Sequence, residues 1–297
     1  MKKITLFFIA VFFAFQCKTT QAQNLAPYTN VGIYKDNITE TSKAVQTALE
    51  SKGFVIIGSY NPEGKPNLKV LAYTRTDLQQ AVIKVKDRGA LASVLKVGLK
   101  SATDGTSVSY LNPDYIFNAY LRSEYPTHAA SLSKVSKDVV SALSPLGKEN
   151  KGFGGSLSPA DLRKYQYKPM MPNFSDPVTL KTFSSFEEGM KVIEKNLEAK
   201  KGGTKLVYQL KFNSNKVAIY GVGLLDPKKG EPSFLPTIGE DHLAALPYEI
   251  ILQDKTATML HGRYRIALHW PELTMGTFMK IMSAPGNIED ALSSLCE

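Results

Sequence analysis

The chain has 297 residues, of which 43% are hydrophobic, 21% charged and 10% aromatic. This composition can bury a substantial core and excludes a disordered or collagen-like chain. Lysine and arginine number 36 against 27 acids, but residues 1–22 hold three lysines and no acid, so a chain cleaved there would carry about 9 − 3 = +6. The surplus forms no basic block, which argues against a nucleic-acid partner.

Residues 1–22 have the pattern of an export signal. Lys2 and Lys3 precede an apolar run from Ile4 to Phe15, and small residues suited to a signal peptidase end at Ala22. We expect cleavage after Ala22 and export to the periplasm or the medium. The apolar run is shorter than the roughly 20 residues that span a bilayer, so no transmembrane anchor is expected.

The two cysteines leave a second reading of the N-terminus open. Cys17 offers an alternative, lipid anchoring, although Gln16 stands where a bacterial lipoprotein signal has a small residue. After cleavage only Cys296 remains, and a single thiol forms no internal disulfide. We interpret Cys296 as incidental.

Hydrophobic periodicity predicts a first repeat domain over residues 23–143. Strands are expected over residues 31–34, 54–60, 68–74, 94–99 and 106–111. Helices are expected over residues 39–52 and 77–85 and between residues 114 and 143, the first of them capped by Thr39.

Residues 144–177 contain five prolines and four glycines, a composition that predicts a linker. A second repeat domain is expected over residues 178–297. Its predicted strands cover residues 178–183, 205–212, 217–225, 248–252 and 256–270. An amphipathic helix over residues 186–200 and a C-terminal helical stretch complete it.

The two predicted domains repeat one order of elements, β-α-β-β-α-β-β-α. Residues 91–93 (LAS) match residues 243–245 (LAA) at an offset of 152, and residues 112–114 (NPD) match residues 270–272 (WPE) at 158. We therefore predict an internal duplication with a period near 150. The two copies would pack as a pseudo-two-fold dimer within a monomer.

One segment of the second half carries a resemblance. Residues 217–254 contain an apolar strand, the turn DPKKGEP over residues 226–232, and Leu246-Pro247 before a strand that ends in an acid. These features resemble the family called domain of unknown function 302, and residues 70–82 and 108–121 resemble it in the first half. The resemblance implies two tandem divergent copies of a compact α+β fold, with an antiparallel sheet backed by helices. It implies no activity.

The segment Met259–Trp270 predicts a strand with a row of basic and titratable groups. Strand alternation would place His261, Arg263, Arg265 and His269 on one face, about 7 Å apart. Such a row could receive a carboxylate or phosphate, and we take these four residues as the ligand-binding candidates. The alternative is a solvated outer face of an antiparallel sheet.

Glu240, Asp241 and His242 bring together two carboxylates and an imidazole, which are metal-ligand types. Adjacent residues in a loop cannot all turn inward, so a loop surface is the alternative. No phosphate loop, dinucleotide fingerprint or nucleophile elbow is present, and no cofactor is expected.

These features predict a non-enzymatic ligand-binding or interaction module of the cell envelope. Its partner would be a small anionic ligand or an envelope protein. Replacing Arg263 and Arg265 together by Ser would then abolish anion binding and leave the fold intact. The alternative is a hydrolase-like enzyme with its site at the domain junction, where His242 or His261 is the base and Arg263 stabilises charge.

Overall fold

The computed structural model describes residues 23–297, so the predicted export signal and Cys17 lie outside the described residues. The described chain forms two antiparallel sheets of six and five strands with helices packed around them, which confirms the α+β class. Among these residues, no helix combines the length and the hydropathy needed to cross a bilayer.

The first half follows the predicted order of elements. Its elements are β1 (Tyr28–Tyr34), α1 (Ile38–Glu50), β2 (Val55–Tyr60), β3 (Leu68–Thr74), α2 (Thr76–Val82), β4 (Leu95–Ala102), β5 (Gly105–Leu111), α3 (Pro113–Leu121) and α4 (Tyr125–Leu143). Asn37 rather than Thr39 caps α1, because the Asn37 side chain accepts hydrogen bonds from the backbone N–H groups of Thr39 and Glu40.

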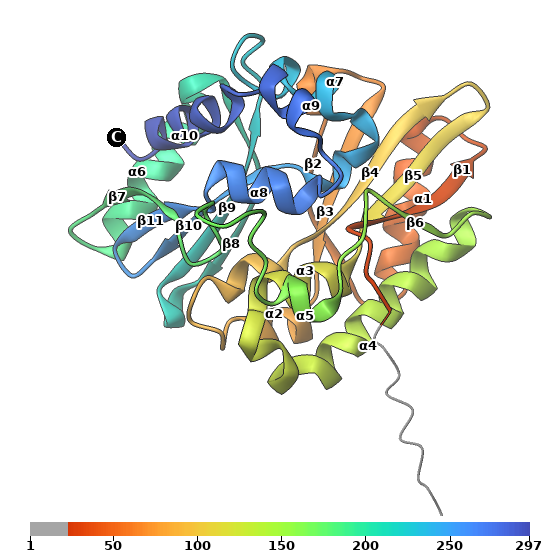
Figure 1. Ribbon diagram of the computed structural model, residues 1–297, viewed down its shortest axis with the longest axis horizontal. Coiled ribbons are helices and arrows are strands. Elements are labelled where there is room, and N and C mark those ends of the chain that lie inside the picture. Colours follow the sequence, from red (N-terminus) through yellow and green to blue (C-terminus); the bar gives the residue numbers. More distant parts are fainter. Residues whose placement is uncertain (1–22) are drawn as a thin grey trace, which may run out of the picture.

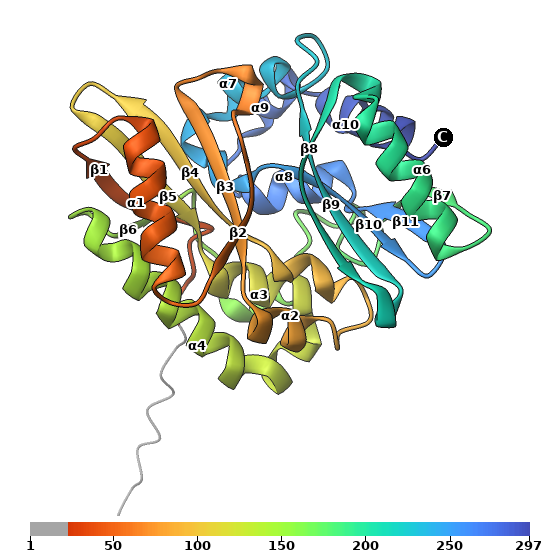
Figure 2. The same cartoon turned by 180° about the vertical axis from the view of Figure 1, so that it is seen from behind.

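The first sheet has the strand order β2-β3-β4-β5-β1-β6. One of its faces is covered by α1, with α4 packed alongside (Figure 2). Val45 and Leu49 of α1 are fully buried in this layer. The opposite face is partly covered by a 3₁₀ segment of the second half, η8 (Glu240–Ala245).

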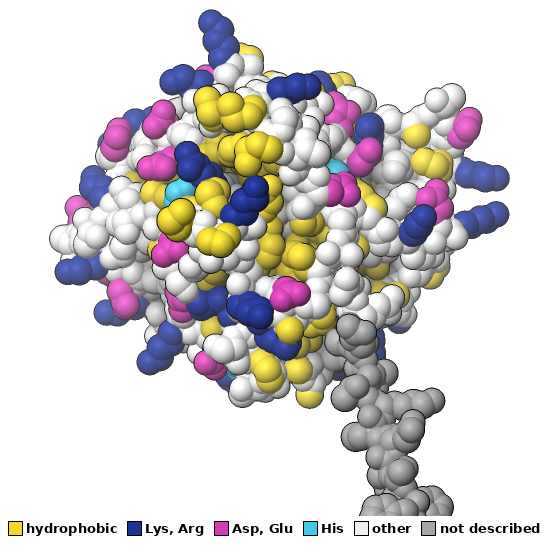
Figure 3. All heavy atoms as spheres, in the orientation of Figure 1, with side chains coloured by type: hydrophobic (Ala, Val, Ile, Leu, Met, Phe, Trp, Pro, Cys, Tyr) yellow, Lys and Arg dark blue, Asp and Glu magenta, His cyan; other side chains and the backbone are white. Residues whose placement is uncertain are grey.

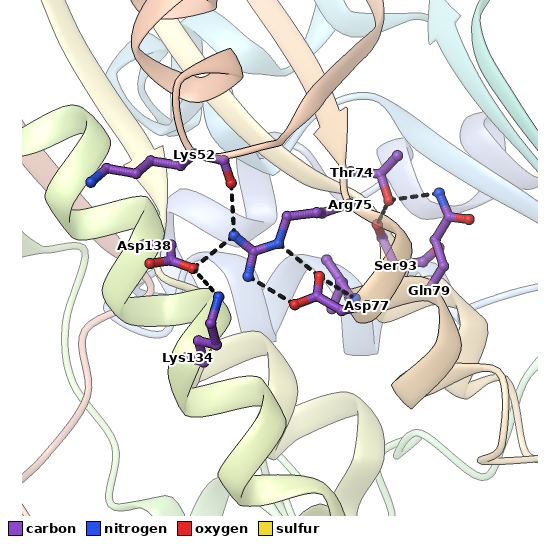
Figure 4. A network of polar contacts seen from close by, with 9 residues as sticks. Lys52, Thr74, Arg75, Asp77, Gln79, Ser93, Lys134 and Asp138 are labelled. Atoms are coloured by element: carbon purple, nitrogen blue, oxygen red, sulfur yellow. Dashed lines mark hydrogen bonds and ion pairs between the residues drawn. The ribbon is translucent and has the colours of Figure 1, made fainter.

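A polar network ties the helices of the first half to its sheet (Figure 4). The guanidinium of Arg75, at the end of β3, donates to both carboxylate oxygens of Asp77, to Asp138 on α4, and to the carbonyl of Lys52 after α1. Arg75 also lies over the ring of Phe54, 4.5 Å from its centroid. One buried side chain thus links β3 and α2 to α4 and to the residues just after α1.

Residues 144–177 form more structure than their composition indicates. β6 (Lys151–Phe153) extends the first sheet by pairing with β1, and α5 (Pro159–Leu162) follows it. Leu162 and Phe174 are buried. The segment contacts both halves of the chain, since Arg88 donates to the carbonyl of Phe174 and the Tyr165 hydroxyl donates to the carbonyl of Ala267.

The second half builds a sheet of order β7-β11-β10-β9-β8. Its elements are β7 (Val178–Thr182), α6 (Phe186–Glu198), β8 (Thr204–Phe212), β9 (Val217–Leu224), α7 (Leu235–Ile238), β10 (Tyr248–Gln253), β11 (Thr256–Met259), α8 (Gly262–His269), α9 (Met275–Lys280) and α10 (Ala284–Ser294). Figure 1 shows α8 lying between the two sheets.

The predicted strand over residues 256–270 is wrong beyond Met259. β11 ends there, and α8 begins at Gly262 with His261 as its cap. Tyr264, Arg265, Ile266, Leu268 and His269 are all buried, so this helix has little polar surface. A helix buried on most of its circumference shows no amphipathic period, and its sequence also satisfies strand alternation.

The two sheets share one order of strands, because β1 to β5 and β7 to β11 occupy corresponding places. The halves meet where β2 crosses β8, and each of these strands carries a bulge at the crossing. Gly58 of β2 lies so close to β8 that a Cβ there would be 1.9 Å from the carbonyl oxygen of Val207.

We expect Gly58→Ala to lower the free energy of unfolding by about 2 kcal/mol, because the clash is with backbone that cannot rotate away. Chemical denaturation measures this loss. Gly286→Ala is the matched control, since a Cβ there meets nothing within 4 Å and α10 would gain helix propensity. Equal stability of the two variants would contradict the close crossing of β2 and β8.

Candidate functional site

The four predicted ligand-binding side chains lie on α8 and at its start, and they do not form one row. His261 accepts a hydrogen bond from the backbone N–H of Arg263, whose own side chain is exposed. Arg265 and His269 are four residues apart and both are buried. The predicted single face is wrong, because a helix turns about 100° per residue and separates these side chains.

Arg265 is held in the interior by the segment that precedes β10. Its Nη2 donates to the carbonyl oxygens of Ala245 and Pro247, at 2.5 and 2.7 Å, and to Glu249 at 3.2 Å. The guanidinium stacks over the ring of Tyr248, 3.9 Å from the centroid. The side chain is 2% exposed, so it cannot present its charge to a ligand in solution.

Glu249 joins the two halves through a buried ion cluster. It accepts from Lys96 of β4 in the first half and from Arg265 of the second. Burial alone would raise the pKa of Glu249, but the charges of Lys96 and Arg265 outweigh it and hold that pKa below its usual value. Burial is also the main reason that the pKa of Lys96 is lowered. Two cations and one carboxylate leave this cluster with a positive excess.

His269 lies beside this cluster in a shell of tyrosines. Its Nδ1 is 3.2 Å from the hydroxyl of Tyr28, and its Nε2 is 3.4 Å from that of Tyr120. Burial first, and then the positive charge of Arg265, holds the pKa of His269 well below its ordinary value. His269 is therefore neutral at physiological pH, and its side chain is part of the packed interior.

A large cleft lies on the first sheet, on the face away from α1. It has a volume of about 680 Å³ and is walled by β1, β4, β5 and the glycine-rich strand end at residues 152–155. The second half contributes residues 240–243 of η8 and Glu272. Both halves are needed to form it, which is common for ligand sites at domain junctions.

Carboxylates outnumber lysines in this cleft. Its charged lining residues are Glu149, Glu240, Asp241, Glu272, Lys100 and Lys151. Lys100 is 3.1 Å from Asp241, and Lys65 from outside the cleft is 2.9 Å from Glu240. The cleft is thus acidic on a chain whose overall charge is positive.

The structure does not arrange Glu240, Asp241 and His242 as metal ligands. Glu240 and Asp241 form ion pairs with lysines, and the imidazole of His242 points into the interior of the protein. Over residues 23–297, no three His, Cys, Asp or Glu side chains come close enough to hold a metal ion. The alternative, a loop surface, is also wrong for His242, because the three residues begin η8 and the His242 side chain is buried.

His242 forms the inner wall of the cleft and is surrounded by aromatic rings. It stacks on Trp270 at 5.7 Å and meets the edges of Tyr28 and Phe153 at 5.1 and 5.5 Å. Both ring nitrogens are buried and have no hydrogen-bond partner in the part of the chain that the structure describes. Burial lowers the pKa of His242 to about 4, so the ring is neutral at pH 7.

Sequence reasoning missed most of the cleft. Lys100, Lys151, Glu149 and Glu272 belong to segments that are far apart in the chain, and nothing in their local pattern connects them. The nearest available signal was the run of glycines at residues 152–155. Gly154 has a positive φ of 85°, and a Cβ there would lie 3.3 Å from His242 Nε2.

Comparisons with known proteins add little to this picture. No family model matches the chain, and no curated protein matches it. One solved structure similar to part of it is an uncharacterised conserved protein DUF302 from Bacillus stearothermophilus, with 12% identity and a TM-score of 0.35. The similarity covers 39% of this chain and 95% of that chain. The structure itself defines the class, an α+β protein of two antiparallel sheets, and the internal duplication stays a prediction.

Proposed function

We propose that the protein is a non-enzymatic, exported binding module of the cell envelope. Its site is the cleft between the first sheet and η8, and its ligand is a small polar molecule that carries positive charge. The observation that carries this proposal is the excess of carboxylates over lysines in a cleft built by both halves. An acidic cleft on a basic protein concentrates cations against the overall field.

The size and chemistry of the cleft support this choice of ligand. A volume of about 680 Å³ is that of a typical small-molecule site. Glu149 and Glu272 have no lysine or arginine partner among the described residues, so their charges are available to an ammonium or guanidinium group. Ser107, Ser109 and Asn30 also line the cleft and can bind hydroxyl groups.

The hydrolase-like alternative has less support. His242 is the only described histidine that lines the cleft, yet neither of its ring nitrogens bonds to Ser107 or Ser109. Arg263 is not in the cleft wall, so it cannot stabilise charge there. A base without a nucleophile or an anion-stabilising partner does not make a hydrolytic site.

Export is tested by measuring the mass of the mature protein. The protein is purified from the cell envelope of its host and measured by native and by denaturing mass spectrometry. A chain that starts at Gln23 would support cleavage after Ala22, and a lipid-sized increment on Cys17 would support the anchored alternative. An uncleaved N-terminus would contradict export. A mass that is retained only under native conditions would identify the ligand directly.

Ligand binding is tested by calorimetry with putrescine, choline and arginine as cationic probes and citrate as an anionic one. We expect a cationic probe to bind, and we expect the double variant Glu272→Gln/Glu149→Gln to weaken this binding about thirtyfold, since each of the two lost ion pairs is worth about 1 kcal/mol. Glu198→Gln on α6 is the control, because that side chain is exposed outside the cleft. Tighter binding of citrate than of every cation would refute the proposed ligand class.

A further inference from the structure

A second pocket lies beside α8, where four segments meet. Its volume is about 310 Å³. Its walls come from the end of α3, the residues after α5, the segment 173–175, and Tyr264 of α8. Figure 3 shows Lys and Arg side chains gathering on this face of the molecule, in the region where Figure 1 places α3 and α5.

The charge of this pocket is the reverse of the charge of the cleft. Arg122, Arg163 and Lys164 line it, and none of the described residues that line it is a carboxylate. Asp87 bonds to Arg122 from outside the wall, at 2.5 Å, and Asp161 is 3.8 Å from the exposed Lys164. Three cations against these two peripheral carboxylates leave the interior of the pocket positive.

Two buried donors in this pocket have no partner. The Tyr264 hydroxyl and the Arg122 Nε are both buried, and neither makes a hydrogen bond within residues 23–297. Tyr264 is 2% exposed, so bulk water does not reach it freely. Leaving such groups unsatisfied costs about 1–3 kcal/mol each, and an acceptor in the pocket would remove that cost. Ser175 and Ser123 add hydroxyl donors to the same wall.

Arg122 has a backbone conformation that is unfavourable for a non-glycine residue. It directly follows α3 with φ of 51° and ψ of −125°, a conformation that a non-glycine residue rarely adopts. Its guanidinium stacks on Phe174 at 4.5 Å and donates to Ser175 at 2.9 Å. Arg88 lies over the same ring at 5.1 Å. These contacts fix the guanidinium at the pocket wall, which preorganises it as a donor.

We propose that this pocket binds the phosphoryl group of a small molecule. Arg122, Arg163 and Lys164 would neutralise its charge, and the Tyr264 hydroxyl would satisfy one oxygen. Guanidinium groups match the oxygens of a phosphoryl group in pairs, and three cations suit a dianion better than a single carboxylate. The volume exceeds what one phosphate fills, and Tyr165 and Phe174 supply aromatic surface for the rest of the ligand.

This site is independent of the proposed cleft. The two share no lining residue, and they have opposite charge. A failure of either proposal therefore leaves the other one standing.

The test is isothermal titration of the protein with phenyl phosphate, inorganic phosphate and phenol. We expect phenyl phosphate to bind more tightly than inorganic phosphate, to lose affinity as salt is added, and phenol not to bind. Arg163→Gln and Lys164→Gln should each weaken binding about tenfold, as expected for one charge-assisted hydrogen bond. Lys164 is largely exposed, so its replacement leaves the fold unchanged.

Arg263→Gln is the matched control, because it removes an exposed arginine of α8 that does not line the pocket. The proposal is overturned if neither phosphate compound binds. It is also overturned if Arg163→Gln and Lys164→Gln bind as well as the Arg263→Gln control. Equal affinity for inorganic phosphate and phenyl phosphate would overturn the assignment of the aromatic wall to the ligand.

Discussion

Replacing Arg265 by Ser should lower the free energy of unfolding by about 3–5 kcal/mol, the cost of breaking a buried ion pair by removing one partner. The change leaves the carbonyl oxygens of Ala245 and Pro247 without their donor and reduces the positive charge around Glu249. It also opens a cavity over the ring of Tyr248. Denaturant unfolding followed by circular dichroism measures the loss.

Arg263→Ser is the matched control on the same helix. Its side chain is exposed, so the free energy of unfolding should change by less than about 0.5 kcal/mol. If Arg265→Ser were as stable as Arg263→Ser, the buried ion cluster would not hold the two halves together. The expectation that both arginines can be replaced without harm to the fold therefore does not extend to Arg265.

Local patterns predicted much of the fold. α6 shows a clear helical period that ends in two glycines, and β9 is an uninterrupted apolar run between turn residues. Both were placed within two residues of their observed bounds, because each buries one face or both faces against its own half. The same order of elements in each half also led to the correct fold class.

The sequence did not predict α8 as a helix, because its helical conformation depends on the surrounding structure and not on the hydrophobic pattern of its own residues. It packs between the two sheets and is buried nearly all round, so neither period dominates its sequence. Arg265 and His269 look like surface residues by type, and their burial is explained by tertiary partners that include the carboxylate of Glu249 and the hydroxyl of Tyr28. These partners lie 16 and 241 residues away along the chain.

The cleft and the phosphoryl pocket depend on tertiary structure in the same way. The cleft joins strands of the first half to η8 of the second, and the pocket joins α3, α5 and α8. In the chain, η8 follows β5 by more than a hundred residues and α8 follows α5 by a hundred, although α3 and α5 are nearer to each other. The net charge of the chain adds the charges of the acidic cleft to those of the basic pocket, so it indicates neither site.

His242 should make the protein less stable as the pH falls from 7 to 4. Its pKa is about 4 in the folded chain against an ordinary value of 6.5, so the unfolded chain takes up the proton first. The stability that this group contributes is present above pH 6.5 and is lost as the pH falls through 4. The gap in pKa corresponds to about 3 kcal/mol at most. His242→Gln should therefore lose less stability on acidification than the unmodified protein.

Glu231→Gln is the control with the opposite sign. Glu231 is fully buried beside Tyr60, and burial raises its pKa to about 7, so the folded chain holds this proton when the unfolded chain has released it. Its contribution is present below pH 4.5 and is lost as the pH rises through 7. Glu231→Gln should thus lose more stability on acidification than the unmodified protein. The same direction of change in both variants would contradict the assigned burial.

Trp270 gives His242 a direct optical readout. It is the only tryptophan in the chain, and it stacks on the His242 ring. A protonated imidazole quenches indole fluorescence, so emission should fall with an apparent pKa near 4 while circular dichroism still reports a folded chain. The step should vanish in His242→Gln. Because His242 is also the inner wall of the cleft, a ligand that binds there should change the same emission at pH 7, which joins the test of this pKa to the test of the proposed site.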